Sequence, residues 1–167
     1  DMDIYGQWDN ESEGIFLDAD MNEQDKGSTS VTGYIYPLAP KSGLDLHIAG
    51  SGTNIKFLEF YMPGIASDIK GRAYGEAHLY GQFSGINLEG HLLTDASLKI
   101  DVLNTPFALK DTLHFSTTGI DFNQIQLTDP EGHKGTLNGR LNYHHFGDLS
   151  YRFNVASQNL LVMNTNE

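Results

Sequence analysis

Seven histidines are the side chains of this sequence best suited to bind a transition metal or to transfer a proton near neutral pH. His144 and His145 are adjacent, so in a strand they point to opposite faces and cannot chelate one ion together. Four others are scattered and share no spacing: His78, His91, His114 and His133. The sequence therefore predicts no metal site and no cofactor.

The acidic segment that begins at Asp18 and Asp20 resembles the start of an EF-hand calcium loop. The sixth position of that loop is Glu23, where glycine is needed, and the twelfth is Thr29, where a bidentate carboxylate belongs. We interpret the segment as a solvated acidic turn. A calcium site of another kind, built from Asp18, Asp20 and Asp25, remains the alternative.

Nucleophile and cofactor motifs are missing from the sequence. Ser84 lies one position away from a Gly-x-Ser-x-Gly elbow, and the strand-to-helix context of that elbow is lacking. The segment from Gly50 to Gly52 lacks the third glycine of a dinucleotide-binding loop and is followed by strand-like sequence. We therefore predict no catalytic residues and a protein that is not an enzyme.

Composition narrows the possible partners. The chain has 167 residues, about one domain, and a formal charge of −12 that argues against binding to nucleic acid. It has no cysteine, so disulfides and thiolate metal sites are excluded. No apolar run approaches the roughly 20 residues that cross a bilayer. Either the native protein is soluble or the sequence is a piece of a longer one.

Alternation of apolar and polar residues with period two dominates the chain and predicts a mostly β protein. Each predicted strand has one apolar and one polar face, as in the segment where Leu98 and Ile100 alternate with Lys99 and Asp101. The inward residues that we expect to line an apolar groove are Leu98, Ile100, Val102, Leu113, Phe115, Leu137, Leu141, Leu149, Tyr151, Phe153 and Val155.

Glycines recur every four to six residues between Gly71 and Gly90 and interrupt the alternation there. Such glycines mark bulges, bends or close backbone approach, and we expect them to curl long strands into a trough. The predicted fold is thus an all-β, long, curled antiparallel or mixed sheet, trough-like and solenoid-like, with an apolar interior. At most one short helix is expected, at residues 55–63.

A strand pattern occurs twice, in residues 13–62 and again in residues 123–167. Ile15 and Leu17 correspond to Ile125 and Leu127 in this repeat. Further matches are Gly33 with Gly139, residues 44–49 with 149–156, and Asn54-Ile55 with Asn159-Leu160. Repeated strand units typically stack and bury their apolar faces against one another. We expect one β-trough, residues 1–167, that contains two related units.

Several runs resemble the TamB family of the AsmA-like superfamily, in its Bacteroidota version. They are residues 54–63, 67–75, 79–90, 100–107, 125–129, 135–139 and 146–151, and they lie between residues 54 and 151. The motifs are short apolar and glycine patterns without a catalytic group. The resemblance implies a periplasmic β-trough, tethered to the inner membrane in the full-length protein, with an interior proposed to carry phospholipid toward the outer membrane.

The resemblance also implies partners: phospholipid acyl chains, and an outer-membrane barrel of the TamA type contacted through parts outside this fragment. A role in outer-membrane protein assembly and secretion follows from it in the same way. The residues alone leave two alternatives. One is a structural or adhesive β-solenoid or sandwich with a packed interior. The other is a glycan-binding module that uses Trp8, Tyr34, Tyr36, Phe60, Tyr61 and Tyr80.

Overall fold

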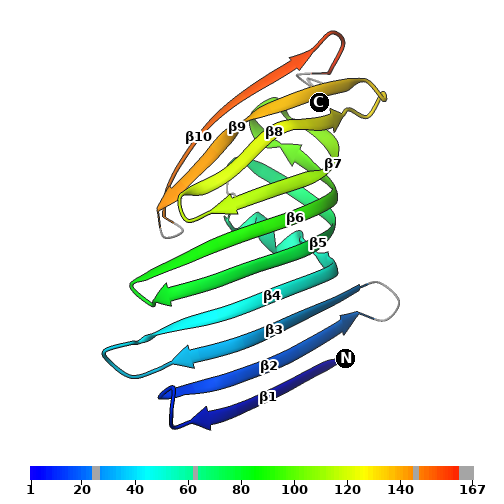
Figure 1. Ribbon diagram of the computed structural model, residues 1–167. Helices are drawn as coiled ribbons and strands as arrows, with labels where there is room; N and C mark the ends of the chain where they lie inside the picture. Colours follow the sequence, from blue (N-terminus) through cyan, green and yellow to red (C-terminus); the bar gives the residue numbers. More distant parts are fainter. Residues whose placement is uncertain (24–26, 62–63, 145–146, 162–167) are drawn as a thin grey trace.

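The protein is all-β, with ten strands that form a single open sheet in chain order (Figure 1). The computed structural model describes residues 1–23, 27–61, 64–144 and 147–161, without the side chains of residues 57, 60, 61, 102 and 147–149. The strands are β1 (Met2–Asp9), β2 (Gly14–Glu23), β3 (Gly27–Tyr36), β4 (Gly43–Asn54), β5 (Ala66–Gln82), β6 (Gly85–Ile100), β7 (Thr105–Ser116), β8 (Gly119–Thr128), β9 (Lys134–His144) and β10 (Gly147–Ser157).

Each strand pairs with the next one in the chain, and every pairing between the described strands is antiparallel. The prediction of an all-β fold is confirmed. Of the two predicted kinds of sheet, antiparallel is correct and mixed is wrong. A sandwich does not fit either, because the described strands belong to one sheet. The sequence favours this meander because short turns join most neighbouring strands, β4 and β5 excepted, and such turns permit only antiparallel pairing.

The strand register brings the apolar positions of neighbouring strands opposite one another. Leu17 lies opposite Gly33, which lies opposite Leu46, and Leu46 lies opposite Leu79. Directly opposite residues point to the same side of a sheet. One side of the sheet, which we call the apolar face, therefore carries the alternating apolar residues. The other side, the polar face, carries the residues between them.

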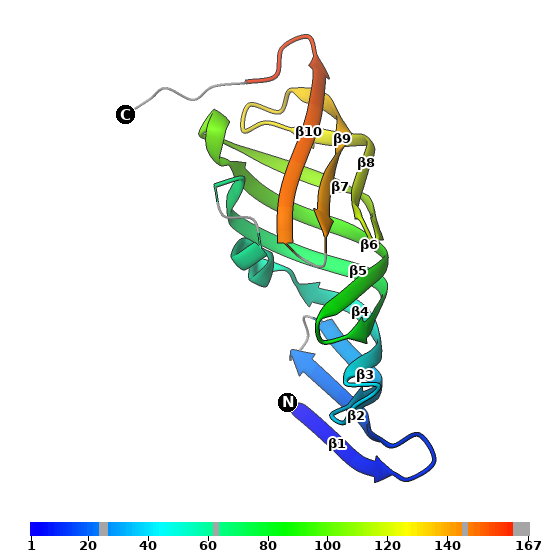
Figure 2. The same cartoon turned by 90° about the vertical axis from the view of Figure 1, so that its left-hand side faces the viewer.

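Part of the apolar face is covered. A core cluster joins buried residues of β5–β9, among them Phe107 and Ile125, each 1% exposed. The first of two 3-10 helices, η1 (Lys56–Tyr61), lies beside β5 and contributes Leu58 to this cluster (Figure 2). Leu160, after β10, is buried in the same cluster. We call the apolar face of β5–β9 the covered half.

The helix expected at residues 55–63 corresponds to η1 over the described part of that range; Met62 and Pro63 lie outside the described residues. A second 3-10 helix, η2 (Asp101–Leu103), follows β6 directly. The prediction of at most one short helix is therefore wrong. The prediction that Leu98, Ile100 and Val102 lie in a single strand is also wrong. The strand ends at Ile100, where the chain enters η2, and η2 is capped at its C-terminal end by Asn104, which has a left-handed φ of 48°.

Glycines within β5 and β6 mark close approach of the backbones. A Cβ built on Gly75, where φ is 147°, would lie 2.2 Å from the carbonyl oxygen of His91. Gly90 has a φ of 151°, and its Cβ would lie 2.3 Å from the carbonyl oxygen of Glu76. The β5–β6 register shifts only between Ser67 and Lys70, so neither glycine forms a bulge. Only glycine permits this spacing and backbone conformation.

The first unit of the predicted repeat contains the strands β2–β4, and the second contains the end of β8 followed by β9 and β10. At the matched positions after the third strand, Ile55 is 3% exposed and Leu160 is 8% exposed. Both side chains belong to the core cluster. The repeat itself stays a prediction, but its two ends meet in one core.

No helix among the described residues combines the length and the hydropathy that crossing a bilayer requires.

Candidate functional site

The residues predicted to line an apolar groove lie mainly within the core cluster. Leu113, Leu137 and Leu141 are buried in it. Four others are partly buried against it: Leu98, Ile100, Phe115 and Phe153. Most of the predicted lining is therefore already packed.

Two of the predicted residues, on β10, are more accessible. Tyr151 is 56% exposed and Val155 is 38% exposed, and both lie opposite apolar-face residues of β9. The side chains of Val102 and Leu149 lie outside the described part of the structure.

Accessible apolar side chains also lie at the other end of the sheet, on the apolar face of β1–β4, which we call the open half. Within it Ala19 and Leu46 are buried, and the accessible side chains are those of the edge strand β1. Met2, Ile4 and Trp8 of β1 are 60%, 65% and 43% exposed. They lie opposite apolar-face residues of β2. No described residue of β1–β4 belongs to the core cluster. The sequence analysis predicted no groove residue in β1, although Met2, Ile4 and Trp8 alternate with polar residues along this strand.

The open half has few groups that could hold a polar ligand. Among the described strand residues, its only charged side chain is Glu23, at the end of β2. Complete burial of an apolar side chain the size of Ile4 or Met2 is worth about 1.5–3 kcal/mol relative to exposure. A ligand that covers the open half would thus gain mainly from hydrophobic contact.

The polar face has a different chemistry, because the register brings ionisable side chains together in the middle of the sheet. His47 of β4 lies directly opposite His78 of β5, and their rings stack with centroids 4.3 Å apart. Asp45 lies two residues before His47, and its Oδ1 atom is 2.6 Å from Nε2 of His78. The sequence analysis did not find this group, because the two histidines are far apart in the chain.

Two further ionisable groups lie on the same face. The rings of His91 and His114, on β6 and β7, are tilted, with centroids 6.5 Å apart. Arg140 of β9 donates hydrogen bonds to both carboxylate oxygens of Asp121 on β8, at 2.5 and 2.6 Å, and also to Thr118. Both groups consist of contacts between neighbouring strands, and neither pair places a nucleophilic side chain beside a base.

The acidic pair Asp18 and Asp20 lies in β2, so the acidic turn is wrong. Both side chains are exposed, and they share the polar face with Asp3. Asp25, needed for the alternative calcium site, lies outside the described residues, as does His145.

The aromatic residues proposed for glycan stacking are divided between the two faces. Tyr34 and Tyr36 stack on the polar face, with ring centroids 6.0 Å apart. Trp8 pairs with Ile15 and lies on the apolar face. The side chains of Phe60 and Tyr61 lie outside the described part. The six residues therefore do not form one platform.

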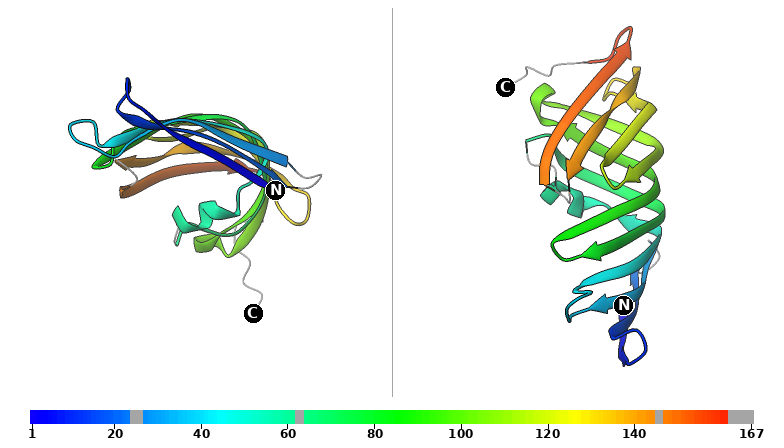
Figure 3. Two further views of the ribbon diagram at one scale, coloured as in Figure 1. Left: turned by 90° about the horizontal axis from the view of Figure 1, so that it is seen from below. Right: turned by 60° about the vertical axis from the view of Figure 1, so that its left-hand side comes forward.

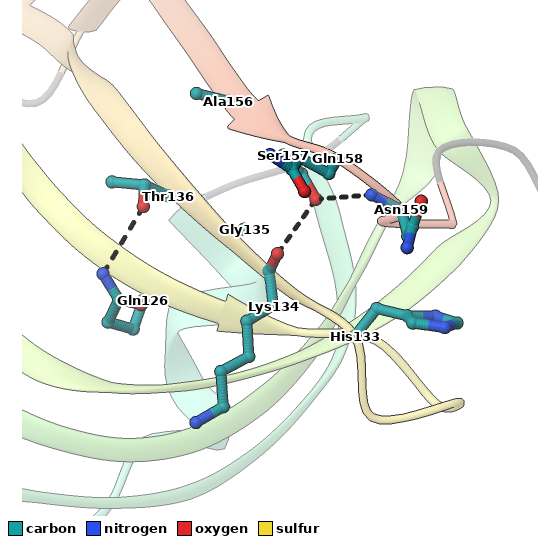
Figure 4. Close-up of a pocket in the computed structure, with 9 residues that line it drawn as sticks. All are labelled: Gln126, His133, Lys134, Gly135, Thr136, Ala156, Ser157, Gln158 and Asn159. Carbon is teal, nitrogen blue, oxygen red and sulfur yellow. Dashed lines mark hydrogen bonds between the residues drawn. The ribbon is translucent and has the colours of Figure 1, made fainter.

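A polar depression lies between the ends of β9 and β10 (Figure 4). Its hydrogen bonds are structural: Ser157 donates to the carbonyl oxygen of Lys134 at 2.9 Å, and the amide of Asn159 donates to Ser157 at 3.2 Å. In Figure 4 the side chains of Lys134 and His133 point away from Ser157. This arrangement gives Ser157 no activating base among the residues drawn.

Asp129 anchors the segment that carries Leu160. Burial alone would raise the pKa of Asp129, but hydrogen bonds from the amides of Leu161, His133 and Glu131 and from the His133 ring outweigh it. The pKa of Asp129 is lowered to about 2. The ionised carboxylate thus holds the β8–β9 turn and the chain after β10 together.

Comparison with known proteins gives no relative from which a function could be transferred: no family model, no curated protein and no solved structure matches this chain.

Proposed function

We propose that this protein is a non-enzymatic, TamB-like segment of a bacterial cell envelope that binds phospholipid acyl chains on its apolar face. One observation carries the proposal: the register brings most of the alternating aliphatic residues of the sheet to one face, and at the β1 edge of that face Met2, Ile4 and Trp8 are exposed. At about 4.8 Å per strand, a ten-stranded sheet extends about 43 Å across its strands. That distance would accommodate an extended acyl chain.

The proposal includes the trough. The sheet would curl around the acyl chain, with the apolar face inside and the acidic polar face toward water. In the full-length protein we place it in the periplasm, tethered to the inner membrane, where it would pass phospholipid between the membranes or assist outer-membrane protein assembly. Its outer-membrane partner would be a barrel of the TamA type. The resemblance of the short apolar and glycine runs supports this assignment.

Photo-crosslinking at neighbouring residues tests which face binds lipid. Ile4 is 65% exposed on the apolar face, and Tyr5 is 54% exposed on the polar face. A photoreactive amino acid at position 4 should crosslink to phosphatidylcholine vesicles, whereas the same group at position 5 should not. Equal crosslinking from both positions contradicts the proposal.

Binding of pyrene-labelled lysophosphatidylcholine, which has one acyl chain and no net charge, gives a second test. Ile48→Arg places a charge on the apolar face of β4 and should weaken binding about tenfold or more, because the charge must be desolvated. Ala49→Arg is the matched control, since Ala49 is exposed on the polar face opposite Glu76. Equal loss in both variants would show that lipid does not bind the apolar face.

A further inference from the structure

The polar face carries three potential metal ligands close together. The nearest ligand atoms of Asp45, His47 and His78 all lie within 4.8 Å of one another. Oδ1 of Asp45 is 2.6 Å from Nε2 of His78 and 3.9 Å from Nε2 of His47. In tetrahedral zinc sites, bonds of about 2.0–2.2 Å separate the ligand atoms by about 3.3–3.5 Å. To reach that spacing around one ion, the two stacked rings would have to turn toward each other and the contact between Asp45 and His78 would have to open.

We propose that Asp45, His47 and His78 bind a divalent transition-metal ion of the Zn²⁺ class. Two imidazoles and one carboxylate suit Zn²⁺, Cu²⁺ or Ni²⁺, whereas Ca²⁺ and Mg²⁺ prefer oxygen ligands only. Three protein ligands leave the fourth position of a tetrahedral ion open to water or to an external ligand. This site lies on the face opposite the proposed lipid surface and does not depend on that proposal.

The sheet itself holds the ligands in place. Asp45 and His47 are two residues apart on β4, so both side chains point to one face, and His78 is the direct cross-strand neighbour of His47. The two rings are nearly parallel, with an interplanar angle of 6°. Tyr80 stacks on His78 with centroids 4.4 Å apart. The ligand positions therefore sit on three paired strand residues and not on a loop.

The surrounding charge favours a cation at this position. Residues 1–55 contain ten acidic side chains and only two lysines. Asp3, Asp18 and Asp20 lie on the same face as Asp45. A field of one sign over a surface raises the local concentration of counterions. Neither histidine is buried, with His47 70% and His78 33% exposed, so an ion can reach both rings from solvent.

Calorimetric titration of the purified chain with Zn²⁺ tests the site. We expect one ion per chain, and we expect Asp45→Asn, His47→Ala and His78→Ala each to weaken binding at least about tenfold, since each removes one ligand. His91→Ala and His114→Ala are controls: they alter a cross-strand histidine pair that lies opposite Glu76 and Asp121, and among the described residues neither histidine belongs to a group of three converging ligand atoms. They should leave the affinity unchanged, and Ca²⁺ should not bind.

Three results would overturn the inference: no binding of Zn²⁺ by the unaltered chain, equal affinity for Ca²⁺, or loss of binding in the His91 and His114 variants as large as in the ligand variants. Thermal unfolding of each variant shows whether it is folded. If His78→Ala unfolds the chain, His47→Ala decides the question, because the more exposed His47 contributes little to packing. A chemical-shift change of the His47 and His78 ring signals on Zn²⁺ addition gives a readout that needs no substitution.

Discussion

Ile125 in the covered half of the apolar face is 1% exposed, whereas Ile4 in the open half is 65% exposed. Both are isoleucines at alternating positions of a strand, and both point to the same side of one sheet. Their difference lies in what covers them. η1 and the segment after β10 lie over the covered half, on the same side of the sheet (Figure 3). The same strand pattern thus yields a core where another segment covers it and exposed apolar side chains at the edge strand β1.

Truncation of the two isoleucines should give the largest contrast. Ile125→Ala removes buried methyl groups from a packed cluster and should lower the free energy of unfolding by about 2–5 kcal/mol. Ile4→Ala should change it by less than about 0.5 kcal/mol, because that side chain is largely exposed. Urea unfolding followed by circular dichroism measures both. Similar losses in the two variants would mean that the halves are equally packed.

Removal of the Asp129 charge should release the segment that covers the core cluster at Leu160. Asp129→Asn should lower the thermal unfolding midpoint by several degrees, because the neutral amide accepts the surrounding hydrogen bonds less well. Asp18→Asn, at an exposed position of β2, serves as control and should leave the midpoint nearly unchanged.

Because of the Asp129 carboxylate, we expect the protein to lose stability in acid. The pKa of this carboxylate is lowered from 3.8 to about 2 on folding, so its contribution is present above pH 3.8 and is lost as the pH falls toward 2. A series of thermal midpoints between about pH 5 and pH 2 should therefore fall less steeply in Asp129→Asn than in the unaltered chain. Parallel curves would exclude this role for Asp129.

The ion pair between Arg140 and Asp121 on the polar face should contribute less to stability than Ile125 or Asp129 does. Arg140 and Asp121 are 35% and 37% exposed, and ion pairs at such positions are typically worth up to about 1 kcal/mol. Arg140→Gln should lower the free energy of unfolding by no more than that amount, and less in high salt. A loss as large as that of Ile125→Ala would show that the polar face contributes to stability as much as the core does.

The smallest effect on stability, with a clear effect on binding, is expected at the edge strand. Met2→Ser combined with Ile4→Ser removes two exposed apolar side chains and should leave urea unfolding unchanged. Fluorescence of an apolar dye such as ANS, which reports accessible hydrophobic surface, should fall in this variant. An unchanged dye signal would place the accessible surface elsewhere on the protein.

Much of the architecture could be predicted from local sequence. The period-two alternation correctly indicates strands, because successive side chains of a strand point to opposite faces. It also indicates which residues share a face: Leu98, Leu113 and Leu137 lie on one side, as the register shows. The end of β6 was missed, because the alternation continues through Val102 although the chain enters η2.

The candidate sites were less accessible to sequence reasoning. Whether Leu141 is buried or Ile4 exposed depends on η1 and Leu160, which approach the sheet from distant parts of the chain. The pairing of His47 with His78 likewise depends on the register of two strands joined by a long connection. Neither the burial of these residues nor the pairing of the two histidines can be predicted from a short sequence motif.

By itself the sequence determined the β class, the two-faced character of each strand and the acidic balance of the polar face, because these follow from side-chain type and from the geometry of one strand. The tertiary structure decided that ten strands form one open antiparallel sheet, that β5–β9 pack into a core cluster which includes no described residue of β1–β4, and that Asp45 meets His47 and His78. Those features arise from contacts between segments far apart in the chain, which local alternation does not specify.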